Sequence, residues 1–369
     1  MKSLSDKGLR SIALALFWAV NSAFIVKYGV RVAGWLPVAL AVVAYGAVLV
    51  AVFPCSWRPA KGLGVATAAV LGVLVVLQCC IDPLSLNVDR WSAIHNWWVY
   101  LFRGDFPYAS VTHLGQHASP FPVWQLVHLP FYLLGNVELS FVVGFAAMVW
   151  AAYRCLGTRA GWNVLIFMVL SPAGLYEVMA YSDFQTNMRL LAAVILILFA
   201  TNRTIENSIC WLVLLIGLLL STRVVVAIPF FILYLRDWLG APWGRKIGFV
   251  VGIGAVFCLT FVPFFFWDGS PELFYEYNPF KLQFKQGNAW DFVVFVPLAI
   301  WLALWWRGNL TRLTFACGLM LLTFISVTYG HLLLSNGLED FYDITYLNSS
   351  LPFLTLTLAT NPEASTERE

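Results

Sequence analysis

Long runs of apolar residues dominate this sequence and limit what it can fold into. A helix needs about 20 apolar residues to cross the hydrocarbon core of a bilayer, and such runs recur almost from end to end. The chain has 60% hydrophobic and 11% charged residues and a mean hydropathy of +0.79, whereas soluble domains carry about 25% charged residues. This pattern predicts an all-α, polytopic transmembrane helix bundle and excludes a soluble multidomain protein.

The apolar runs predict ordinary spans and two irregular segments. Segment 121–135 is too short and proline-rich to cross, and 208–236 reads as two short halves broken around Ser221-Thr222-Arg223. Lipid cannot satisfy free backbone groups, so such breaks occur only where they are buried in protein or line a wet cavity. We therefore expect about 10–12 membrane segments, some broken or re-entrant, and a cavity near the two irregular ones. The ordinary spans are expected near residues 11–30, 34–54, 63–81, 137–153, 162–180, 185–200, 247–267, 291–306, 313–334 and 342–359.

The distribution of Lys and Arg predicts the orientation. With the N-terminus in the cytoplasm, most basic residues fall in inner loops, as the positive-inside rule requires. The first apolar run is long and shows no small-residue cleavage site, so we expect it to stay as the first span. The large loops 82–120 and 268–290 then face outward. We expect one domain over 1–360 in a cell membrane, most simply a bacterial inner membrane, and a disordered cytoplasmic tail at 361–369.

Charge and cysteine usage exclude several classes of partner. The net charge is only +3 and no Lys/Arg run is present, which argues against nucleic-acid binding. The seven cysteines lie mostly inside apolar segments and show no zinc or disulfide spacing. His113 and His117 are four residues apart with Asp105 nearby, which would suit a divalent metal on a helix, but loop histidines are more often solvated. We expect no required cofactor and no metal.

The outer loop 82–120 holds the most informative polar residues. Residues 89–102 are amphipathic and aromatic-rich, which favours a helix lying in the outer interface. Asp89 would stand at its N-terminus, where a carboxylate can cap the helix and complement its dipole. The alternative is that Asp89 accepts a proton from a substrate hydroxyl, as a general base at the membrane surface. Both roles remain open from the residues alone.

The order of elements in this loop resembles a known family. Asp89 is followed by Gly104-Asp105-Phe106-Pro107-Tyr108 and then by Ser119-Pro120-Phe121-Pro122 at the start of the short segment. This order resembles the GT-C superfamily of membrane glycosyltransferases, especially the bacterial polyprenyl-phosphate-mannose-dependent mannosyltransferases. Residues 184–187 and 220–223 extend the likeness. Compared with the family, the chain has two added N-terminal helices before the aspartate.

The resemblance implies a GT-C-like fold with extracytoplasmic juxtamembrane helices and an inverting sugar transfer. A polyprenyl-phosphate-linked mannose or other sugar would pass to a lipid or glycan hydroxyl on the outer face, with Asp89 as general base and Asp105 in reserve. Cationic or polar residues would bind the departing phosphate: Arg223, Arg189, Lys281, Lys285 and His331. Other polar residues would contact the sugar or the acceptor: His95, Tyr108, His113, His117, Gln185, Asn187, Asp340, Tyr342 and Asp343.

Other interpretations fit part of the pattern. Arg223 and Arg189 would also serve as structural partners of Asp183 or Glu177. A flippase would use broken helices but is expected to show repeated halves, and a glycan polymerase or ligase is expected to carry its large outer loop late in the chain. A GT-C-like protein that binds lipid without catalysis is a further alternative.

Overall fold

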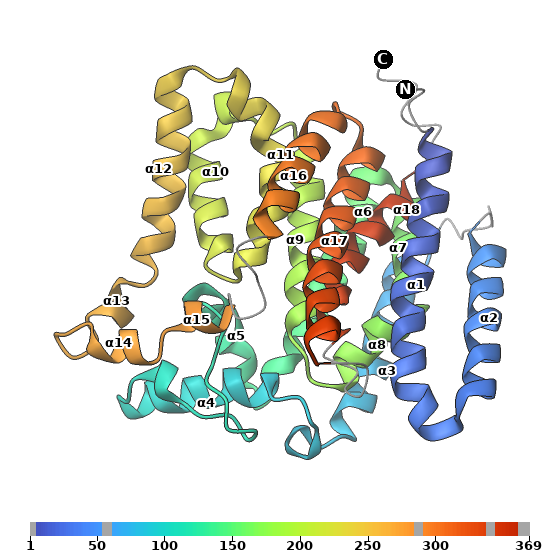
Figure 1. The fold of residues 1–369 in the computed structure, drawn as a ribbon, viewed down its shortest axis with the longest axis horizontal. Helices are drawn as coiled ribbons and strands as arrows, with labels where there is room; N and C mark the ends of the chain where they lie inside the picture. Colours follow the sequence, from blue (N-terminus) through green and yellow to red (C-terminus); the bar gives the residue numbers. More distant parts are fainter. Residues whose placement is uncertain (1–4, 54–60, 284–290, 337–343, 361–369) are drawn as a thin grey trace.

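A computed structural model describes residues 5–53, 61–283, 291–336 and 344–360 (Figure 1). Within these ranges the chain is helical throughout and has no β-strand; Val111 and His117 form an isolated antiparallel bridge. The all-α prediction is therefore confirmed. Apolar residues from distant helices gather in three buried clusters, two of which share partly buried neighbours such as Leu319 and Phe324.

Several helices have the length and composition to cross a membrane. In the described residues there are four such helices, or five if one bent pair counts as a single span. The four are α1 (Asp6–Ala33), α2 (Trp35–Val52), Val137–Leu156, which joins η3 to α6 (Ser140–Leu156), and the Leu310–His331 part of α17 (Leu310–Asn336). Four shorter apolar helices accompany them: α3 (Leu63–Cys79), α9 (Phe184–Ala200), α10 (Ile205–Leu220) and α16 (Phe292–Trp305).

The segment predicted as an ordinary span at 162–180 is a bent pair of helices. Two helices, α7 (Thr158–Val169) and α8 (Pro172–Met179), meet there at a bend of 67°. The local cause is the pair Ser171-Pro172: the Ser171 hydroxyl caps the second helix, and proline is favoured in its first turn. Hydropathy alone does not show this helix boundary, because the run is apolar throughout, but the Ser171-Pro172 pair indicates it.

Polar side chains from the first two helices satisfy the backbone at this bend. The Asn21 side-chain oxygen accepts hydrogen bonds from the Ser171 hydroxyl (2.7 Å) and the Ala173 N–H (3.1 Å). The Tyr45 hydroxyl donates to the Leu170 carbonyl at 2.9 Å. A helix break inside an apolar bundle needs such partners, so α1 and α2 are integral to this part of the fold.

The two irregular segments of the sequence meet in space. The first is the short helix α5 (Pro122–Leu133), and the second is α10, the 3-10 turn η4 (Val224–Val226) and α11 (Ala227–Gly240). The Phe121 N–H donates to the Thr222 carbonyl (3.3 Å) and the Val123 N–H to the Ser221 carbonyl (3.0 Å). The predicted break at 221–223 is confirmed, and its free carbonyls are satisfied by the start of α5.

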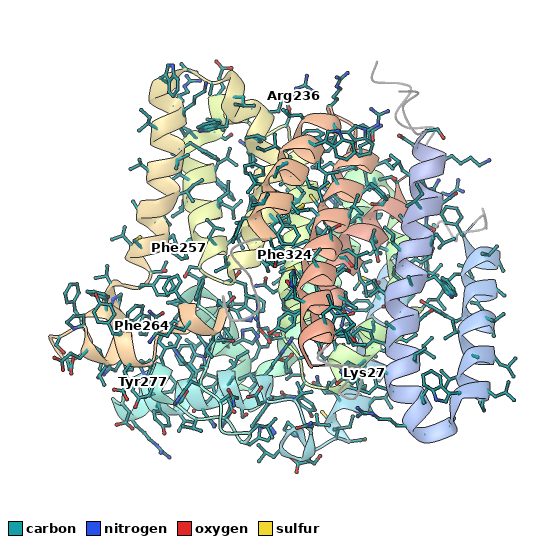
Figure 2. The ribbon with its side chains drawn as sticks, in the orientation of Figure 1. Lys27, Arg236, Phe257, Phe264, Tyr277 and Phe324 are labelled. Carbon is teal, nitrogen blue, oxygen red and sulfur yellow. The ribbon has the colours of Figure 1, made fainter. Side chains whose placement is uncertain are left out.

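The ends of the bundle differ in character. The start of α1 and the end of α18 lie together, since the Arg10 guanidinium donates to the Leu358 carbonyl at 3.1 Å. The opposite end carries short helices that lie across the bundle (Figure 1), and Lys27 and Arg236 mark the two ends in Figure 2. The helices at or leading to that end are α4 (Arg90–Arg103), α12 (Trp243–Leu259), α13 (Val262–Phe265), α14 (Glu272–Glu276) and α15 (Pro279–Gln283); η6 (Ile344–Ser350) and α18 (Leu351–Ala359) complete the chain.

An aromatic cluster fixes α4 against the bundle. The buried face of α4 presents Trp97 and Trp98, which pack with Tyr108, Phe121 and Phe264. Offset and edge-on aromatic pairs are individually favourable, and here Trp97 meets Tyr108 and Phe264 at centroid distances of 5.9 and 5.6 Å. This packing fixes the position from which Asp89 begins the helix.

Candidate functional site

Asp89 occupies the N-cap position of α4 but does not cap it with its side chain. The carboxylate is partly exposed, and its Oδ2 accepts a hydrogen bond from the Thr112 hydroxyl at 2.8 Å. Among the described residues it has no ion-pair partner, and Oδ1 accepts no hydrogen bond. The capping explanation therefore lacks its hydrogen bond, while one carboxylate oxygen stays open toward a ligand.

A tight turn positions Thr112 next to this carboxylate. The backbone N–H of Thr112 bonds the Gln116 carbonyl (2.8 Å), and the Thr112 hydroxyl oxygen accepts from the Gln116 N–H (3.0 Å). Gly115 completes the turn with φ +79°, a conformation that favours glycine. Thr112 was not a predicted site residue, because nothing in the sequence shows that this turn folds back on Asp89.

His113 and His117 have hydrogen-bond partners within the loop. His113 contacts the Ser92 hydroxyl through Nδ1 (2.7 Å) and the Leu86 carbonyl through Nε2 (2.9 Å). His117 Nδ1 lies 3.1 Å from the Ser110 carbonyl. No group of three potential metal ligands occurs in the part of the chain that the structure describes. Both histidines thus have local structural partners.

His95 lies on α4, six residues or about one and a half turns beyond Asp89, and stacks on an aromatic ring. Its ring lies parallel to Trp91, with 4.5 Å between centroids, and 5.2 Å from the ring of Tyr132. Its Nδ1 is buried without a hydrogen-bond partner among the described residues. Burial lowers the pKa of His95, because the charged imidazolium is poorly solvated there.

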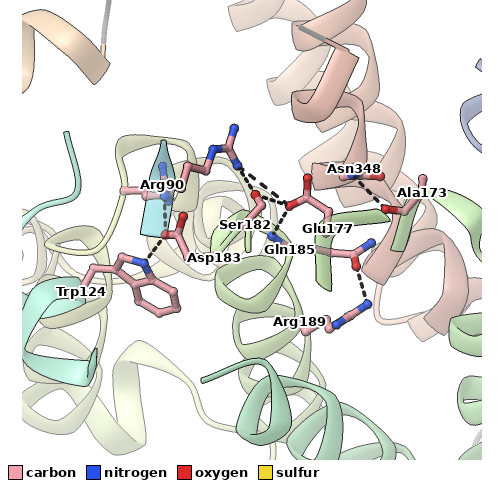
Figure 3. A network of polar contacts seen from close by, with 10 residues as sticks. Arg90, Trp124, Ala173, Glu177, Ser182, Asp183, Gln185, Arg189 and Asn348 are labelled. Carbon is pink, nitrogen blue, oxygen red and sulfur yellow. Dashed lines mark hydrogen bonds and ion pairs between the residues drawn. The ribbon is translucent and has the colours of Figure 1, made fainter. Parts of the chain in front are cut away.

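Arg90 points from the first turn of α4 into the bundle (Figure 3). Its Nη1 donates to the Ser182 hydroxyl at 2.7 Å and lies 3.9 Å from Glu177 Oε2. The guanidinium also lies over the rings of Phe184 and Tyr346 at 5.3 and 5.1 Å. The residue after the candidate base therefore ties the rim of the molecule to a buried polar network.

Asp183 is the centre of that network. It is fully buried just before α9, and its Oδ2 accepts from the Arg223 guanidinium at 2.5 Å and from the Trp124 indole N–H. Trp124 comes from α5 and Arg223 from the break between α10 and α11. A buried carboxylate needs a cation and hydrogen bonds to offset the loss of water, and here both irregular segments supply them.

One donor, Arg223 Nε, and one imidazole nitrogen, His128 Nε2, lie buried beside this ion pair without partners among the described residues. Buried polar groups are nearly always paired, so an unpaired donor marks a place where an acceptor such as water or a ligand oxygen can bind. His128 is held on its other side by the Trp124 carbonyl, 2.8 Å from Nδ1.

The other predicted cations that the structure describes have protein partners. Arg189 donates to Gln185 and lies over the Phe145 ring at 5.3 Å. Lys281 is exposed and donates to the Tyr275 carbonyl at 3.2 Å. His331 on α17 lies 3.0 Å from Asp291, where the structure shows an ion pair if the histidine is protonated. Only Arg223 and Arg189 of this group are fully buried in the bundle.

The other predicted residues are distributed as follows. Tyr108 is buried and donates to the Pro120 carbonyl at 3.3 Å. Asp105 is exposed after the end of α4, and Asn187 is buried one turn into α9. Lys285, Asp340, Tyr342 and Asp343 lie outside the described residues.

Several residues of the network were missed by the sequence analysis. Arg90, Trp124, His128 and Glu138 were not site candidates, yet all four belong to or adjoin the network. Glu138 is buried and lies within electrostatic range of Asp183, Glu177 and both arginines. Glu138 and His128 carry a signal of their own, because a titratable residue inside an apolar segment of a membrane protein usually has a functional or pairing role.

The site thus combines a partly exposed carboxylate at the rim with a buried ion pair, whose Arg223 Nε makes no hydrogen bond among the described residues. Such an arrangement can accept a proton at the surface and bind an anionic group deeper inside. No protein-family model, curated protein or solved structure matches this chain.

Proposed function

We propose that this chain is an integral membrane glycosyltransferase that uses a polyprenyl-phosphate-linked sugar. Asp89 is the general base that takes the proton of an acceptor hydroxyl. The acceptor oxygen bonds to the anomeric carbon as the bond from that carbon to the phosphate oxygen breaks, which inverts the configuration. The polyprenyl phosphate leaves with the electron pair of the broken bond.

One observation carries this proposal: the Asp89 carboxylate is placed at a helix start without capping it. A carboxylate that has a neutral hydroxyl partner and one open oxygen is suited to accept a proton from a second hydroxyl. The Thr112 hydrogen bond orients the carboxylate without neutralising it. An acceptor hydroxyl within hydrogen-bond distance of Oδ1 would complete the geometry.

The leaving phosphate needs positive charge and donors nearby. Arg223 supports this role, because its Nε is unpaired among the described residues while its other end bonds Asp183. Arg90 adds a second cation, close in sequence to the base. A phosphate oxygen at Arg223 Nε would accept that N–H, with the Arg90 guanidinium as a second cation of the same polar network.

Sugar transfer by purified protein tests the proposal. The donor is a polyprenyl-phosphate hexose, the acceptors are a panel of lipid and glycan alcohols, and the matched variants are Asp89→Asn and Asp105→Asn. Loss of a general base lowers rates by about 10²–10⁴-fold. We expect that loss for Asp89→Asn and a near wild-type rate for Asp105→Asn, whose carboxylate is exposed on the same loop. The reverse result would move the base to Asp105.

Lipid binding without catalysis is the second candidate function. It is favoured by the unpaired Arg223 Nε, because a residue that only stabilised the buried break would not need a free donor. A wild-type protein that binds the donor but transfers no sugar to any acceptor would support it. Arg223→Lys, which keeps the charge but loses the Nε donor, would then bind the donor more weakly than wild type.

A further inference from the structure

A cavity of about 700 Å³ lies between α3, α6 and the start of α7. It borders the first half of α3, and α3 ends shortly before Asp89 and α4. The cavity is therefore at the end of the bundle opposite the candidate base. Its size falls within the range of about 300–1,000 Å³ typical of small-molecule sites.

The walls of the cavity are mainly apolar. Its lining includes Leu71, Ala146, Val149 and two aromatic residues, Trp150 and Tyr153, that are largely exposed. Water in a cavity needs two to four polar partners, and these walls offer few. In a bilayer, such a space beside exposed apolar helix faces suits a hydrocarbon chain.

Small residues create this space. Gly64 and Ala68 lie one turn apart on α3, and a Cβ built on Gly64 would meet no atom within 4 Å. By contrast, a Cβ on Gly161 of α7 would lie 2.6 Å from the Leu63 side chain and 3.1 Å from Tyr153 Cβ. Tight contact at Gly161 thus bounds a hollow that larger side chains at Gly64 and Ala68 would fill.

One end of the cavity is positively charged. Lys61 lines it, is exposed and has no ion-pair partner among the residues that the structure describes. Arg154 and Arg159 are exposed and stand next in sequence to the lining residues Tyr153 and Thr158. The α3 helix also begins here, so its first backbone N–H groups and dipole favour an anion.

We propose that this cavity binds an anionic phospholipid, with one acyl chain between α3 and α6 and the phosphate beside Lys61. The apolar walls accept the chain, and the basic end accepts the headgroup. The positive end and the apolar hollow are independent observations, and they lie in the order in which a lipid presents phosphate and tail. This site is separate from the proposed transfer site and does not depend on it.

Thermal unfolding of the purified full chain in detergent tests the proposal. Phosphatidylglycerol is the probe, and phosphatidylcholine and inorganic phosphate are compared with it. A ligand that binds only the folded state raises the unfolding temperature with concentration. We expect phosphatidylglycerol to raise it and the other two to have little effect. Equal shifts with phosphatidylcholine or with inorganic phosphate would overturn the proposal.

Matched variants locate the binding site. Gly64→Leu fills the cavity and should abolish the lipid-induced shift, and Ala68→Leu fills the same space should the first variant fail to fold. Gly248→Leu on α12 is the control, since its Cβ also meets open space but far from the cavity. Lys61→Gln should weaken binding about fivefold, the effect of about 1 kcal/mol per basic residue near anionic lipid. An unchanged shift in both leucine variants would contradict the assignment.

Discussion

Two aspartates at one end of the molecule, Asp89 and Asp183, differ in their exposure and in their hydrogen-bond partners. Asp89 stands at the rim, partly exposed, with a neutral hydroxyl from Thr112 as its partner. Asp183 is fully buried and bonds the Arg223 guanidinium and the Trp124 indole. The buried carboxylate has a cation as its partner, although its Oδ1 makes no hydrogen bond among the described residues, whereas the rim carboxylate has only a neutral hydroxyl partner and is partly exposed.

Removing the charge of Asp183 should have the largest effect on stability of the variants compared here. Asp183→Asn leaves the Arg223 cation buried without compensation, which costs about 3–5 kcal/mol for a buried pair. We expect a large fall in the denaturant or thermal midpoint. Thermal unfolding monitored by circular dichroism measures it.

The double variant Asp183→Leu with Arg223→Met is the control for this prediction. Apolar replacement of both partners removes the desolvation penalty together with the attraction, so most of the lost stability should return. A double variant as unstable as Asp183→Asn would show that the two residues act separately, and the structural role of the pair would be wrong.

Substitutions of Thr112 test whether its hydroxyl positions the Asp89 carboxylate for sugar transfer. Thr112→Val removes the hydroxyl that bonds Asp89 at 2.8 Å, a hydrogen bond to a charged group worth about 1.5–3 kcal/mol. We expect sugar transfer to fall about tenfold or more while Thr112→Ser retains most of it. The measurement is the transfer rate of the two variants at equal concentrations of folded protein. Equal rates in Thr112→Val and Thr112→Ser would show that the hydroxyl does not position Asp89.

A substitution at the C-terminal end of α4 should change the stability less than the substitutions above. Gly104 ends the helix with φ +82°, and a Cβ there meets no neighbouring atom within 4 Å. Gly104→Ala should therefore cost about 1 kcal/mol through backbone strain alone. A loss of stability near that of Asp183→Asn would mean that the rim is as tightly built as the buried centre.

The pH dependence of stability gives the smallest expected effect. Burial lowers the pKa of His95 below its ordinary value of about 6.5. As the pH falls below that value, the unfolded chain binds a proton that the folded chain does not, so stability decreases. His95→Gln should reduce the change of the melting temperature with pH between about pH 7 and 5. An unchanged pH profile in this variant would place the titrating group elsewhere.

Much of the architecture follows from sequence because helix length and helix breaks have local causes. Apolar runs identified α1 and α2, and Ser221-Thr222-Arg223 identified the break before α11. The bend at Ser171 was missed because the surrounding run is apolar throughout, although Ser171-Pro172 marks a helix start. Membrane spans predicted from hydropathy should therefore also be checked for capping residues, which indicate helix starts inside an apolar run.

The site was harder to predict because its contacts join distant segments. Asp89 was identified at the start of its helix, but no local pattern shows that Thr112 folds back to bond it. The direction of Arg90 depends on how α4 rotates against the bundle, which the aromatic cluster around Trp97 decides. The pairing of Arg223 with Asp183 was one of two interpretations, and only the packed structure brings the two residues together.

The most direct test of the central claim is the rate of sugar transfer per folded molecule in Asp89→Asn. Thermal unfolding measured on the same sample gives the folded fraction. We predict a loss of about 10²–10⁴-fold with a stability change of about 1 kcal/mol, because the asparagine amide oxygen can still accept the weaker, neutral hydrogen bond from Thr112. Transfer at the wild-type rate by the folded variant would contradict the assignment of Asp89 as the base.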